Sequence, residues 1–362
     1  MINRIVFAAG GTGGHIYPAI AVADELKKMN KDIKIKFIGA KGRIEEKIVP
    51  GNGYELETIE IQGFSRKLSP KNINVAFKFL NASRRAKSFL KDYKPEIVFG
   101  TGGFVSGPVL WSASQLKIPT VIQEGNSYPG ITVKWLSPKV NKVIVNFEGT
   151  KQYLKKLDNI EVMSYPVRQN MKRILKNEAL KIFGLDDSRK TLFVFGGSQG
   201  ANSINLAVNK CLGHLLARGI QIIWQTGEKD FERLNKEAGL SPFVKLFKYI
   251  DNIDTAYSAC DLVVCRSGIS TIMELAGFGV AAVFVPFPGA SENHQEKNAR
   301  TLADKNAAKL ILDTELDEKL EAGINSLIHN ETELEQMRNN IKQFSDINAA
   351  SKIAQMLLKM VN

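Results

Sequence analysis

Short apolar runs alternate along the whole chain with longer segments in which apolar residues recur at helical spacing. This alternation predicts parallel β-sheets wrapped by helices, because parallel strands are joined by crossover helices and are buried on both faces. The first half contains six expected strands, at residues 4–8, 33–38, 57–61, 97–99, 120–122 and 142–145. The second half repeats the scheme at residues 191–195, 221–225, 244–247, 262–265, 282–285 and 309–312. We therefore expect an α/β protein with two doubly wound, Rossmann-like domains.

The boundary between the two expected sheets lies near Pro166, because no long apolar pattern crosses this point and the proline disfavours helix for the residue before it. We place an N-terminal domain at residues 1–165 and a C-terminal domain at residues 166–345. In the last segment, residues 346–362, the apolar positions fall on one side of a helix. We expect this helix to pack on one of the two domains, and packing back on the N-terminal domain is one choice.

Three glycine-rich turns each follow an expected strand and precede a helical pattern, at residues 10–15, 100–108 and 196–200. They fall at the carboxyl ends of parallel strands, where doubly wound sheets bind ligands. The N–H groups that start the next helix are unpaired and partly positive, so such a turn suits an anion such as phosphate. In the first turn, Thr12 and His15 carry the side chains that can take part in chemistry. The alternative is a strand-to-helix turn with a purely structural role.

The glycine turns do not match two common nucleotide motifs. A dinucleotide fingerprint needs a third glycine and an acid at the end of the second strand, and this strand ends in Phe37-Ile38-Gly39-Ala40. The P-loop needs a glycine followed by Lys and Ser or Thr, and that sequence does not occur. We therefore expect neither a nicotinamide dinucleotide nor hydrolysis of a nucleoside triphosphate.

An acid is better placed in the second half, after the expected strand that ends near Arg266. Ser267, Gly268 and Ser270 form the turn, we expect the helix to begin near Thr271, and Glu274 then lies in its first turn. Its carboxylate can accept two hydrogen bonds from a ribose diol. The alternative is that Glu274 complements the helix dipole. Glycine or serine turns combined with this acid favour a nucleoside diphosphate.

The chain is basic, with 49 Lys and Arg against 37 Asp and Glu and a formal net charge of +12. Residues 64–94 concentrate this charge among apolar side chains, with one acid, Asp92. The pattern is typical of a helix at an anionic membrane surface, and the alternative is a helix packed on its own sheet with a solvated basic face. We expect no nucleic-acid partner, because no nucleic-acid module accompanies the stretch. The basic residues are Arg66, Lys67, Lys71, Lys78, Arg84, Arg85, Lys87, Lys91 and Lys94, and the apolar residues are Phe64, Leu68, Val75, Phe77, Phe79, Leu80 and Phe89.

Five motifs together carry a family resemblance over residues 4 to about 345. In their order and spacing they resemble the bacterial glycosyltransferases that add N-acetylglucosamine to undecaprenyl-diphospho-muramoyl-pentapeptide. The motifs are Gly10-Gly11-Thr12-Gly13-Gly14-His15, Gly102-Gly103-Phe104-Val105-Ser106-Gly107-Pro108, Gly196-Gly197-Ser198-Gln199-Gly200-Ala201, Arg266-Ser267-Gly268, and Pro286-Phe287 followed by His294-Gln295 through Asn298.

The resemblance implies a GT-B fold, with two Rossmann-like domains and the active site in the cleft between them. It implies an N-terminal acceptor and membrane-association domain, a C-terminal UDP-sugar domain, no cofactor and no bound metal. The partners are UDP-N-acetylglucosamine, the undecaprenyl-linked muramoyl-pentapeptide and an anionic membrane surface. The resemblance also implies that the protein is attached peripherally to the cytoplasmic face of the plasma (inner) membrane. Its implied role is peptidoglycan synthesis.

The resemblance also implies donor-site contacts at matching positions. Arg168 and Ser198 meet the diphosphate, the main chain of Ile250 reads uracil, and Asn126 and Gln295 hold the sugar. Thr12, Gly13 and Gly14 meet the sugar and diphosphate. The stretch that holds phosphate and ribose is Ile269, Ser270, Thr271, Ile272, Met273 and Glu274.

This chain departs from the family pattern at two places, so contacts from Gln123 and Gly125 are not carried over. It has Gln123-Glu124-Gly125-Asn126 where the family commonly has His-Glu-Gln-Asn, and Ser164-Tyr165-Pro166 where the family has Gly-Asn-Pro.

The reaction needs a base for the acceptor hydroxyl, and His15 is the histidine that lies on a glycine turn. The alternative for His15 is a hydrogen bond to the diphosphate. Glu124 is a second candidate base, and its alternative role is to orient Asn126. The remaining histidines, His214, His294 and His329, lack the spacing of metal ligands.

We therefore expect an inverting transferase that moves N-acetylglucosamine from the UDP-sugar to the C4 hydroxyl of the muramoyl acceptor. An alternative is another GT-B enzyme that acts on a UDP-sugar, such as a glycolipid glycosyltransferase or a UDP-sugar 2-epimerase. A basic scaffold at the membrane surface is a non-catalytic alternative, but it has no use for three glycine turns.

Overall fold

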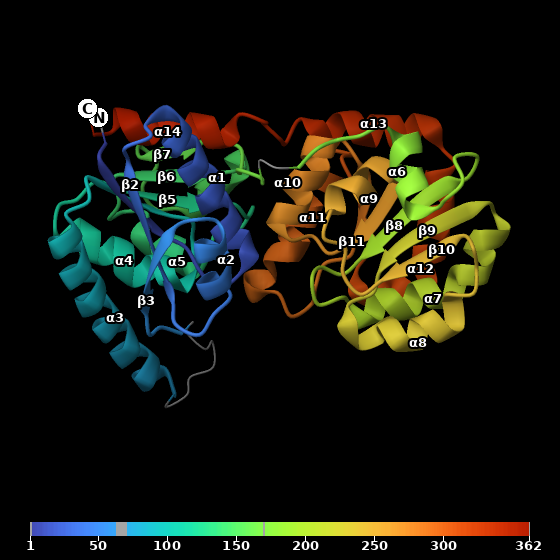
Figure 1. The fold of residues 1–362 in the computed structure, drawn as a ribbon, viewed down its shortest axis with the longest axis horizontal. Coiled ribbons are helices and arrows are strands. Elements are labelled where there is room, and N and C mark those ends of the chain that lie inside the picture. Colours follow the sequence, from blue (N-terminus) through green and yellow to red (C-terminus); the bar gives the residue numbers. More distant parts are fainter. Residues whose placement is uncertain (1, 63–70, 169–170, 362) are drawn as a thin grey trace. The chain divides into compact units, whose positions relative to one another are not determined.

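The computed structural model describes residues 2–62, 71–168 and 171–361, and the chain divides into two compact units. Unit 1 comprises residues 1–169 and 346–362, and unit 2 comprises residues 170–345. Each unit holds one parallel sheet with helices packed on its faces (Figure 1).

The sheet of unit 1 has seven strands in the order β3-β2-β1-β4-β5-β6-β7. Alternate residues of β1 point to opposite faces, so Ile5 and Phe7 enter one apolar layer while Val6 and Ala8 enter the other. The strands are β1 (Arg4–Ala8), β2 (Lys34–Ala40), β3 (Glu55–Ile59), β4 (Ile97–Gly100), β5 (Thr120–Glu124), β6 (Lys142–Val145) and β7 (Ile160–Val162). The connecting elements are α1 (Gly13–Met29), α2 (Glu45–Gly51), α3 (Lys71–Tyr93), α4 (Gly103–Gln115), α5 (Ile131–Leu136) and the 3-10 helix η1 (Glu148–Tyr153).

The C-terminal helix α14 (Ala349–Lys359) belongs to unit 1, where it packs against α1. Ala350, Ile353 and Leu357 recur at helical spacing and are all 0% exposed. They join the apolar layer formed by one face of the sheet. The C-terminal helix therefore shares one apolar core with β1, the first strand of the chain.

Unit 2 repeats the architecture with six parallel strands in the order β10-β9-β8-β11-β12-β13. The strands are β8 (Lys190–Phe195), β9 (Ile220–Gln225), β10 (Val244–Phe247), β11 (Leu262–Cys265), β12 (Ala281–Phe284) and β13 (Lys309–Leu310). The helices are α6 (Lys176–Phe183), α7 (Asn202–Ala217), α8 (Glu228–Ala238), α9 (Ile253–Ala259), α10 (Ile269–Phe278), α11 (His294–Ala303), α12 (Leu316–Ile328) and α13 (Glu331–Lys342), with 3-10 helices η2 (Ser291–Asn293) and η3 (Asp313–Glu315).

The basic segment forms the long helix α3, and part of it packs on its own unit. Ala82, Ala86 and Leu90 are buried against the sheet side, whereas Phe77 and Leu80 are 61% and 48% exposed. The exposed cations of this helix are Arg84, Arg85, Lys87 and Lys91. Phe64, Arg66, Lys67 and Leu68 lie outside the described residues, and the side chains of Lys71 and Val75 are not described.

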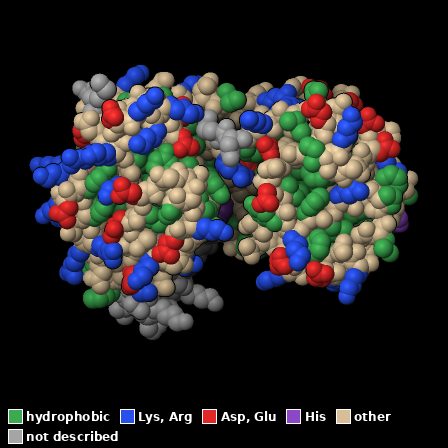
Figure 2. Space-filling view, viewed as in Figure 1, with side chains coloured by type: hydrophobic (Ala, Val, Ile, Leu, Met, Phe, Trp, Pro, Cys, Tyr) green, Lys and Arg blue, Asp and Glu red, His purple; other side chains and the backbone are tan. Residues whose placement is uncertain are grey.

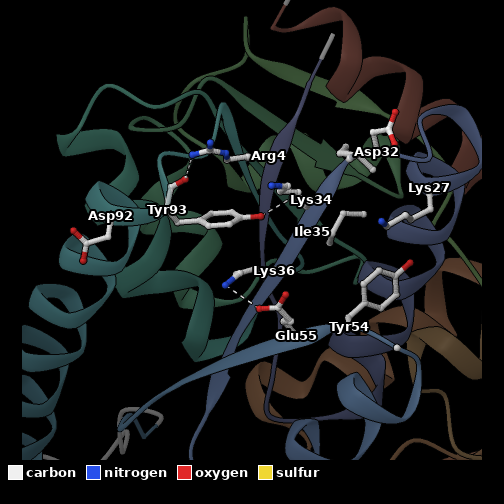
Figure 3. A pocket seen from close by; sticks show the side chains of 12 residues that line it. Arg4, Lys27, Asp32, Lys34, Ile35, Lys36, Tyr54, Glu55, Asp92 and Tyr93 are labelled. Carbon is white, nitrogen blue, oxygen red and sulfur yellow. Dashed lines mark hydrogen bonds and ion pairs between the residues drawn. The ribbon is translucent and has the colours of Figure 1, made fainter.

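A hollow of about 540 Å³ lies beside the amino-terminal parts of β1, β2 and β3 in unit 1 (Figure 3). Three of its charged side chains already have partners within the protein. Lys36 pairs with Glu55 at 2.8 Å, and Arg4 donates to the main-chain oxygen of Tyr93 at 3.0 Å. The glycine turns lie at the opposite ends of these parallel strands, where ligands of doubly wound sheets bind. The candidate site is therefore sought at the carboxyl edge.

Candidate active site

The first glycine turn joins β1 to α1 and is supported from behind by a buried carboxylate. Glu45 is 0% exposed and accepts hydrogen bonds from the N–H groups of Gly11, at 3.2 Å, and Ala40, at 2.8 Å. The N–H of Gly11 is thus used within the protein, and a negative charge lies behind it. The amides left to meet an anion at this turn are therefore those after Gly11. Thr12 precedes the helix and is exposed, and Gly13 and Gly14 form its first residues.

The imidazole of His15 is held by the second glycine turn. Its Nδ1 lies 2.8 Å from the main-chain oxygen of Thr101, and the Thr101 hydroxyl donates to the His15 carbonyl at 2.5 Å. A carbonyl oxygen only accepts hydrogen bonds, so Nδ1 donates and the neutral ring carries its lone pair on Nε2. This is the tautomer that a general base acting through Nε2 requires.

Glu124 ends β5 and organises the loop that carries Asn126. Its carboxylate accepts from the main-chain and side-chain nitrogens of Asn126, both at 2.9 Å, and from the N–H of Gly130 at 2.8 Å. Glu124 is 4% exposed, and burial raises its pKa while these hydrogen bonds oppose the rise. The three donors that surround the carboxylate favour the orienting role over the role of base.

Two further contacts place Tyr165 and Arg168, which follow β7, beside α1. The Tyr165 hydroxyl donates to the main-chain oxygen of Gly14, and the Arg168 guanidinium lies 5.1 Å from the centre of the Tyr17 ring. Arg168 therefore lies beside Tyr17 on the helix that carries His15. The structure brings together Thr12, Gly13, Gly14, His15 and Arg168 at one edge of unit 1.

The third glycine turn, between β8 and α7 in unit 2, is shaped by close main-chain contacts. Gly200 has a φ of +75°, and a Cβ atom there would lie 2.1 Å from the main-chain oxygen of Thr226, so a side chain is excluded. Gln225 donates to the main-chain oxygen of Gly197 at 3.0 Å and accepts from the N–H of Ile250 at 2.8 Å. The Ile250 N–H is therefore used within the protein. Ser198 is exposed at the tip of the turn.

Helix α10 begins earlier than the sequence predicts, and this corrects the place of Glu274. Gly268 precedes the helix and Ile269 is its first residue, so no acid lies in the first turn. The turn therefore ends at Gly268, and Ile269 and Ser270, which we expected before the helix, belong to it. Glu274 is 6% exposed and accepts from the Tyr257 hydroxyl at 3.1 Å. Its interaction with the helix start is therefore weaker than expected, and the dipole alternative loses support.

The stretch from Ile269 to Glu274 contributes unequally to the edge of unit 2. The side chains of Ile272 and Met273 are 0% exposed, and the Ile272 N–H donates to the Gly268 carbonyl at 3.0 Å. The unpaired amides of the helix start are therefore those of residues 269–271. The Ser270 hydroxyl is buried and has no hydrogen-bond partner in the described part of the chain.

A cavity of about 600 Å³ in unit 2 joins the glycine turn to the start of α10. Gln295 lines it, and its Oε1 accepts from the N–H of Phe287 at 2.9 Å, so its NH₂ group remains to donate toward a ligand. The third turn, Gly268, Thr271 and Gln295 share this cavity, whereas Glu274 is not among the residues that line it.

Sequence reasoning missed an ion pair on the wall of this cavity. The Arg266 guanidinium lies 2.5 Å from a carboxylate oxygen of Asp313, and both groups bond the Ser203 hydroxyl. Arg266 also donates to the main-chain oxygens of Val285 and Pro286. These contacts link α7, the turn after β11, the loop after β12 and η3. No local sequence pattern predicts these contacts, because Asp313 is 47 residues from Arg266.

No group of three or more His, Cys, Asp or Glu side chains in a metal-binding arrangement occurs within residues 2–62, 71–168 and 171–361. His214 pairs with Glu321 at 3.1 Å, and His294 contacts the main-chain oxygen of Ser291.

Known proteins match nearly the whole chain. The Glycosyltransferase family 28 N-terminal domain matches residues 5–145, and the C-terminal domain of the same family matches residues 191–353. A protein of Flavobacterium psychrophilum is 41% identical over 99% of this chain and 98% of its own length, and one of Bacillus pumilus is 39% identical over 98% of each. Both are named UDP-N-acetylglucosamine–N-acetylmuramyl-(pentapeptide) pyrophosphoryl-undecaprenol N-acetylglucosamine transferase.

Solved structures agree with the family match. The crystal structure of Acinetobacter baumannii MurG covers 99% of each chain at a TM-score of 0.81 and 28% identity. A Neisseria meningitidis UDP-GlcNAc 2-epimerase matches at a TM-score of 0.68 and 16% identity, with 98% of this chain and 100% of that chain covered, which shows a shared fold alone. The prediction of two Rossmann-like domains of the GT-B class is confirmed. The chain belongs to glycosyltransferase family 28.

Proposed function

We propose that this chain is an inverting glycosyltransferase that moves N-acetylglucosamine from UDP-N-acetylglucosamine to the C4 hydroxyl of undecaprenyl-diphospho-N-acetylmuramoyl-pentapeptide. The observation that carries the proposal is identity of about 40% over nearly the full length to proteins named for this reaction. The epimerase alternative rests on a shared fold at 16% identity, so it gains no support from the comparison. The reaction serves peptidoglycan synthesis.

In the proposed reaction the acceptor C4 oxygen forms a bond to the anomeric carbon while the bond to the UDP oxygen breaks on the opposite face. His15 takes the hydroxyl proton on Nε2, since its Nδ1 donates to Thr101. Negative charge grows on the departing diphosphate. Arg168, Ser198 and the amides of residues 269–271 are the proposed groups that stabilise it, and donors fixed in advance are effective because they need no reorganisation.

The remaining donor contacts are assigned by chemistry. The Ile250 carbonyl accepts from uracil, Gln295 donates to sugar hydroxyls, and Asn126, oriented by Glu124, binds the acetamido sugar. Glu274 is the proposed partner of the ribose diol. Glu274 is buried and bonded to the Tyr257 hydroxyl, so this role requires the side chains around Tyr257 to move and expose the carboxylate to the ribose.

We also propose that unit 1 attaches peripherally to the cytoplasmic face of the inner membrane through α3. Lys and Arg side chains line the edge of unit 1 where this helix lies (Figures 1 and 2). Exposed Phe77 and Leu80 on the same helix supply apolar groups for the interface. Of the described helices, none has the length and apolar character needed to cross a bilayer.

The function is tested by measuring UDP release from UDP-N-acetylglucosamine with and without the polyprenyl-diphospho-muramoyl peptide. Release that depends on the acceptor, with a disaccharide product, is the expected result. Conversion of the donor to UDP-N-acetylmannosamine without acceptor contradicts the transferase and favours an epimerase. Attachment is tested separately with anionic vesicles. Binding that weakens with salt, and weakens further in an Arg84→Glu, Lys87→Glu variant, is expected, and salt-independent binding contradicts the role of α3.

A further inference from the structure

Unit 1 contains an apolar cavity of about 270 Å³ that the contacts proposed above do not use. Helices α3, α4 and α5 supply most of its wall, through Phe79, Phe104, Ile131 and Trp135. The rings of Phe79 and Trp135 meet edge to face at 5.7 Å. The wall is therefore built by side chains from three helices rather than by one exposed loop.

Gly107 lines the cavity and leaves its space open, because glycine has no side chain. A Cβ atom at Gly107 would lie 3.3 Å from the Phe79 ring and 3.6 Å from Cγ2 of Thr132. Glycine at this position lets helix α4 approach both side chains without filling the space between them.

The chemistry of the wall selects an uncharged apolar ligand. None of the described residues that line the cavity is charged, and its polar side chains are the Gln62 amide and the Thr132 hydroxyl. A nucleotide, a diphosphate or a sugar would lose its hydration here without gaining enough hydrogen bonds. A hydrocarbon chain meets no such cost.

One wall residue of the cavity, Phe104, also packs on the turn that precedes the proposed base. The Phe104 ring packs on the first glycine turn, where a Cβ atom at Gly11 would lie 2.8 Å from it. The preceding residue, Gly103, packs on the ring of His15, since a Cβ atom there would lie 3.0 Å from Cδ2. Two adjacent residues of α4 therefore contact the cavity on one side and His15 on the other.

The rim of the cavity leads toward solvent through apolar side chains. Ile131 is 59% exposed and Trp135 is 37% exposed, and both line the cavity. An apolar chain can thus enter from the surface and end close to the catalytic turn.

We propose that this cavity is a subsite for the part of the polyprenyl chain nearest to the diphosphate of the acceptor. The inference rests on the proposed function, because the acceptor is the substrate that carries such a chain. It places recognition of the isoprene units in unit 1, separate from attachment of α3 to the membrane.

The test fills the cavity and measures acceptor use in detergent, without vesicles. Thr132→Phe places a ring in the space, and Thr132→Ser is the matched control. The filled variant should raise KM for an undecaprenyl acceptor about tenfold, with kcat and the KM for UDP-N-acetylglucosamine unchanged. An acceptor that carries a methyl group in place of the polyprenyl chain should show no change. An equal rise in KM for both acceptors, or no rise for either, overturns the proposal.

A binding measurement separates the subsite from the proposed reaction. Trp111 and Trp135 lie near the cavity, with ring centres 6.3 Å apart, so geranylgeranyl diphosphate should change tryptophan fluorescence on binding. Ile131→Asp, at an exposed position that folding should tolerate, should abolish this change, whereas Leu80→Asp on α3 should keep it. Loss in both variants, or in neither, contradicts the subsite. This result does not depend on turnover, so a protein that binds the prenyl chain yet releases no UDP would refute the function and not the subsite.

Discussion

Gly103 packs against the imidazole of His15 so closely that a Cβ atom at this position would lie 3.0 Å from the ring carbon Cδ2. Gly103→Ala should therefore shift the ring and lower kcat at least tenfold, because a proton acceptor displaced by a fraction of an ångström loses its alignment. Gly42→Ala is the matched control, since Gly42 has the same φ of +71° but nothing within 4 Å of the added methyl. At both positions the positive φ strains an alanine, so the control accounts for this backbone cost. Equal activity in steady-state assays of the two variants would contradict the role of this packing.

His15→Ala should lower kcat by about 10² to 10⁴, the usual contribution of a general base. KM for UDP-N-acetylglucosamine should stay within a few-fold, because the proposed contacts of His15 are with the acceptor. His214→Ala is the control, since this exposed histidine pairs with Glu321 in unit 2. If His15→Ala instead raised the dissociation constant of UDP with little effect on kcat, the histidine would serve the diphosphate rather than the acceptor.

The two sheets could be predicted from sequence because their central strands are short apolar runs that end in glycine turns. β1 and β8 are examples, and both are almost fully buried. β7 was missed because it has three residues and lies at the sheet edge, where half-exposed positions leave no clear apolar pattern. β3, expected at residues 57–61, pairs two residues earlier because its register follows β2, with Glu55 opposite Lys36. Edge strands depend on their neighbour more than on their own composition.

The candidate site was predictable where it consists of main-chain turns and was not where it depends on distant partners. Glycines followed by a helix mark the turns locally. Glu45 behind the first turn and Asp313 beside Arg266 are 34 and 47 residues from the groups they bond. Their roles follow from tertiary contacts that no spacing encodes. The start of α10 was misplaced for a related reason, since Gly268 ends the turn sooner than a serine-rich segment suggests.

Glu274→Gln tests the proposed ribose contact. The amide retains an oxygen that accepts from Tyr257, so the fold should persist, but a charged acceptor is lost. We expect the dissociation constant of UDP to rise about tenfold or more, since hydrogen bonds to charged groups contribute about 1.5–3 kcal/mol. Calorimetric titration measures the change. Tyr257→Phe is the companion variant, because it leaves the carboxylate in place. Unchanged affinity for UDP in Glu274→Gln would remove the ribose role.

Asp313→Ala should destabilise unit 2 by about 3–5 kcal/mol, because it leaves the largely buried Arg266 guanidinium without its charged partner. Asp317→Ala removes an acid four residues later that pairs with Lys210 across 3.6 Å at the exposed surface. This control should change little, since exposed pairs contribute little to stability. Urea unfolding of both variants gives the comparison. A similar loss in the two would show that the Arg266 network does not hold the cavity wall together.

Glu331 should make unit 2 sensitive to acid. Hydrogen bonds from Lys190 and Arg338 lower the pKa of Glu331 from its ordinary value of 4.5 to about 2. Its deprotonated form is thus favoured by folding, so its contribution to stability is full above pH 4.5 and is lost as the pH falls toward about 2. The effect should be modest, because the side chain is 60% exposed and solvent screens the pairs.

In thermal unfolding, Glu331→Gln should lower Tm at pH 7 and lose less further stability between pH 4.5 and 2 than the parent. Glu335→Gln, which alters an exposed acid 3.5 Å from the same arginine, should keep the parent's pH dependence. An identical acid response in the parent and in Glu331→Gln would mean that other carboxylates set the acid limit.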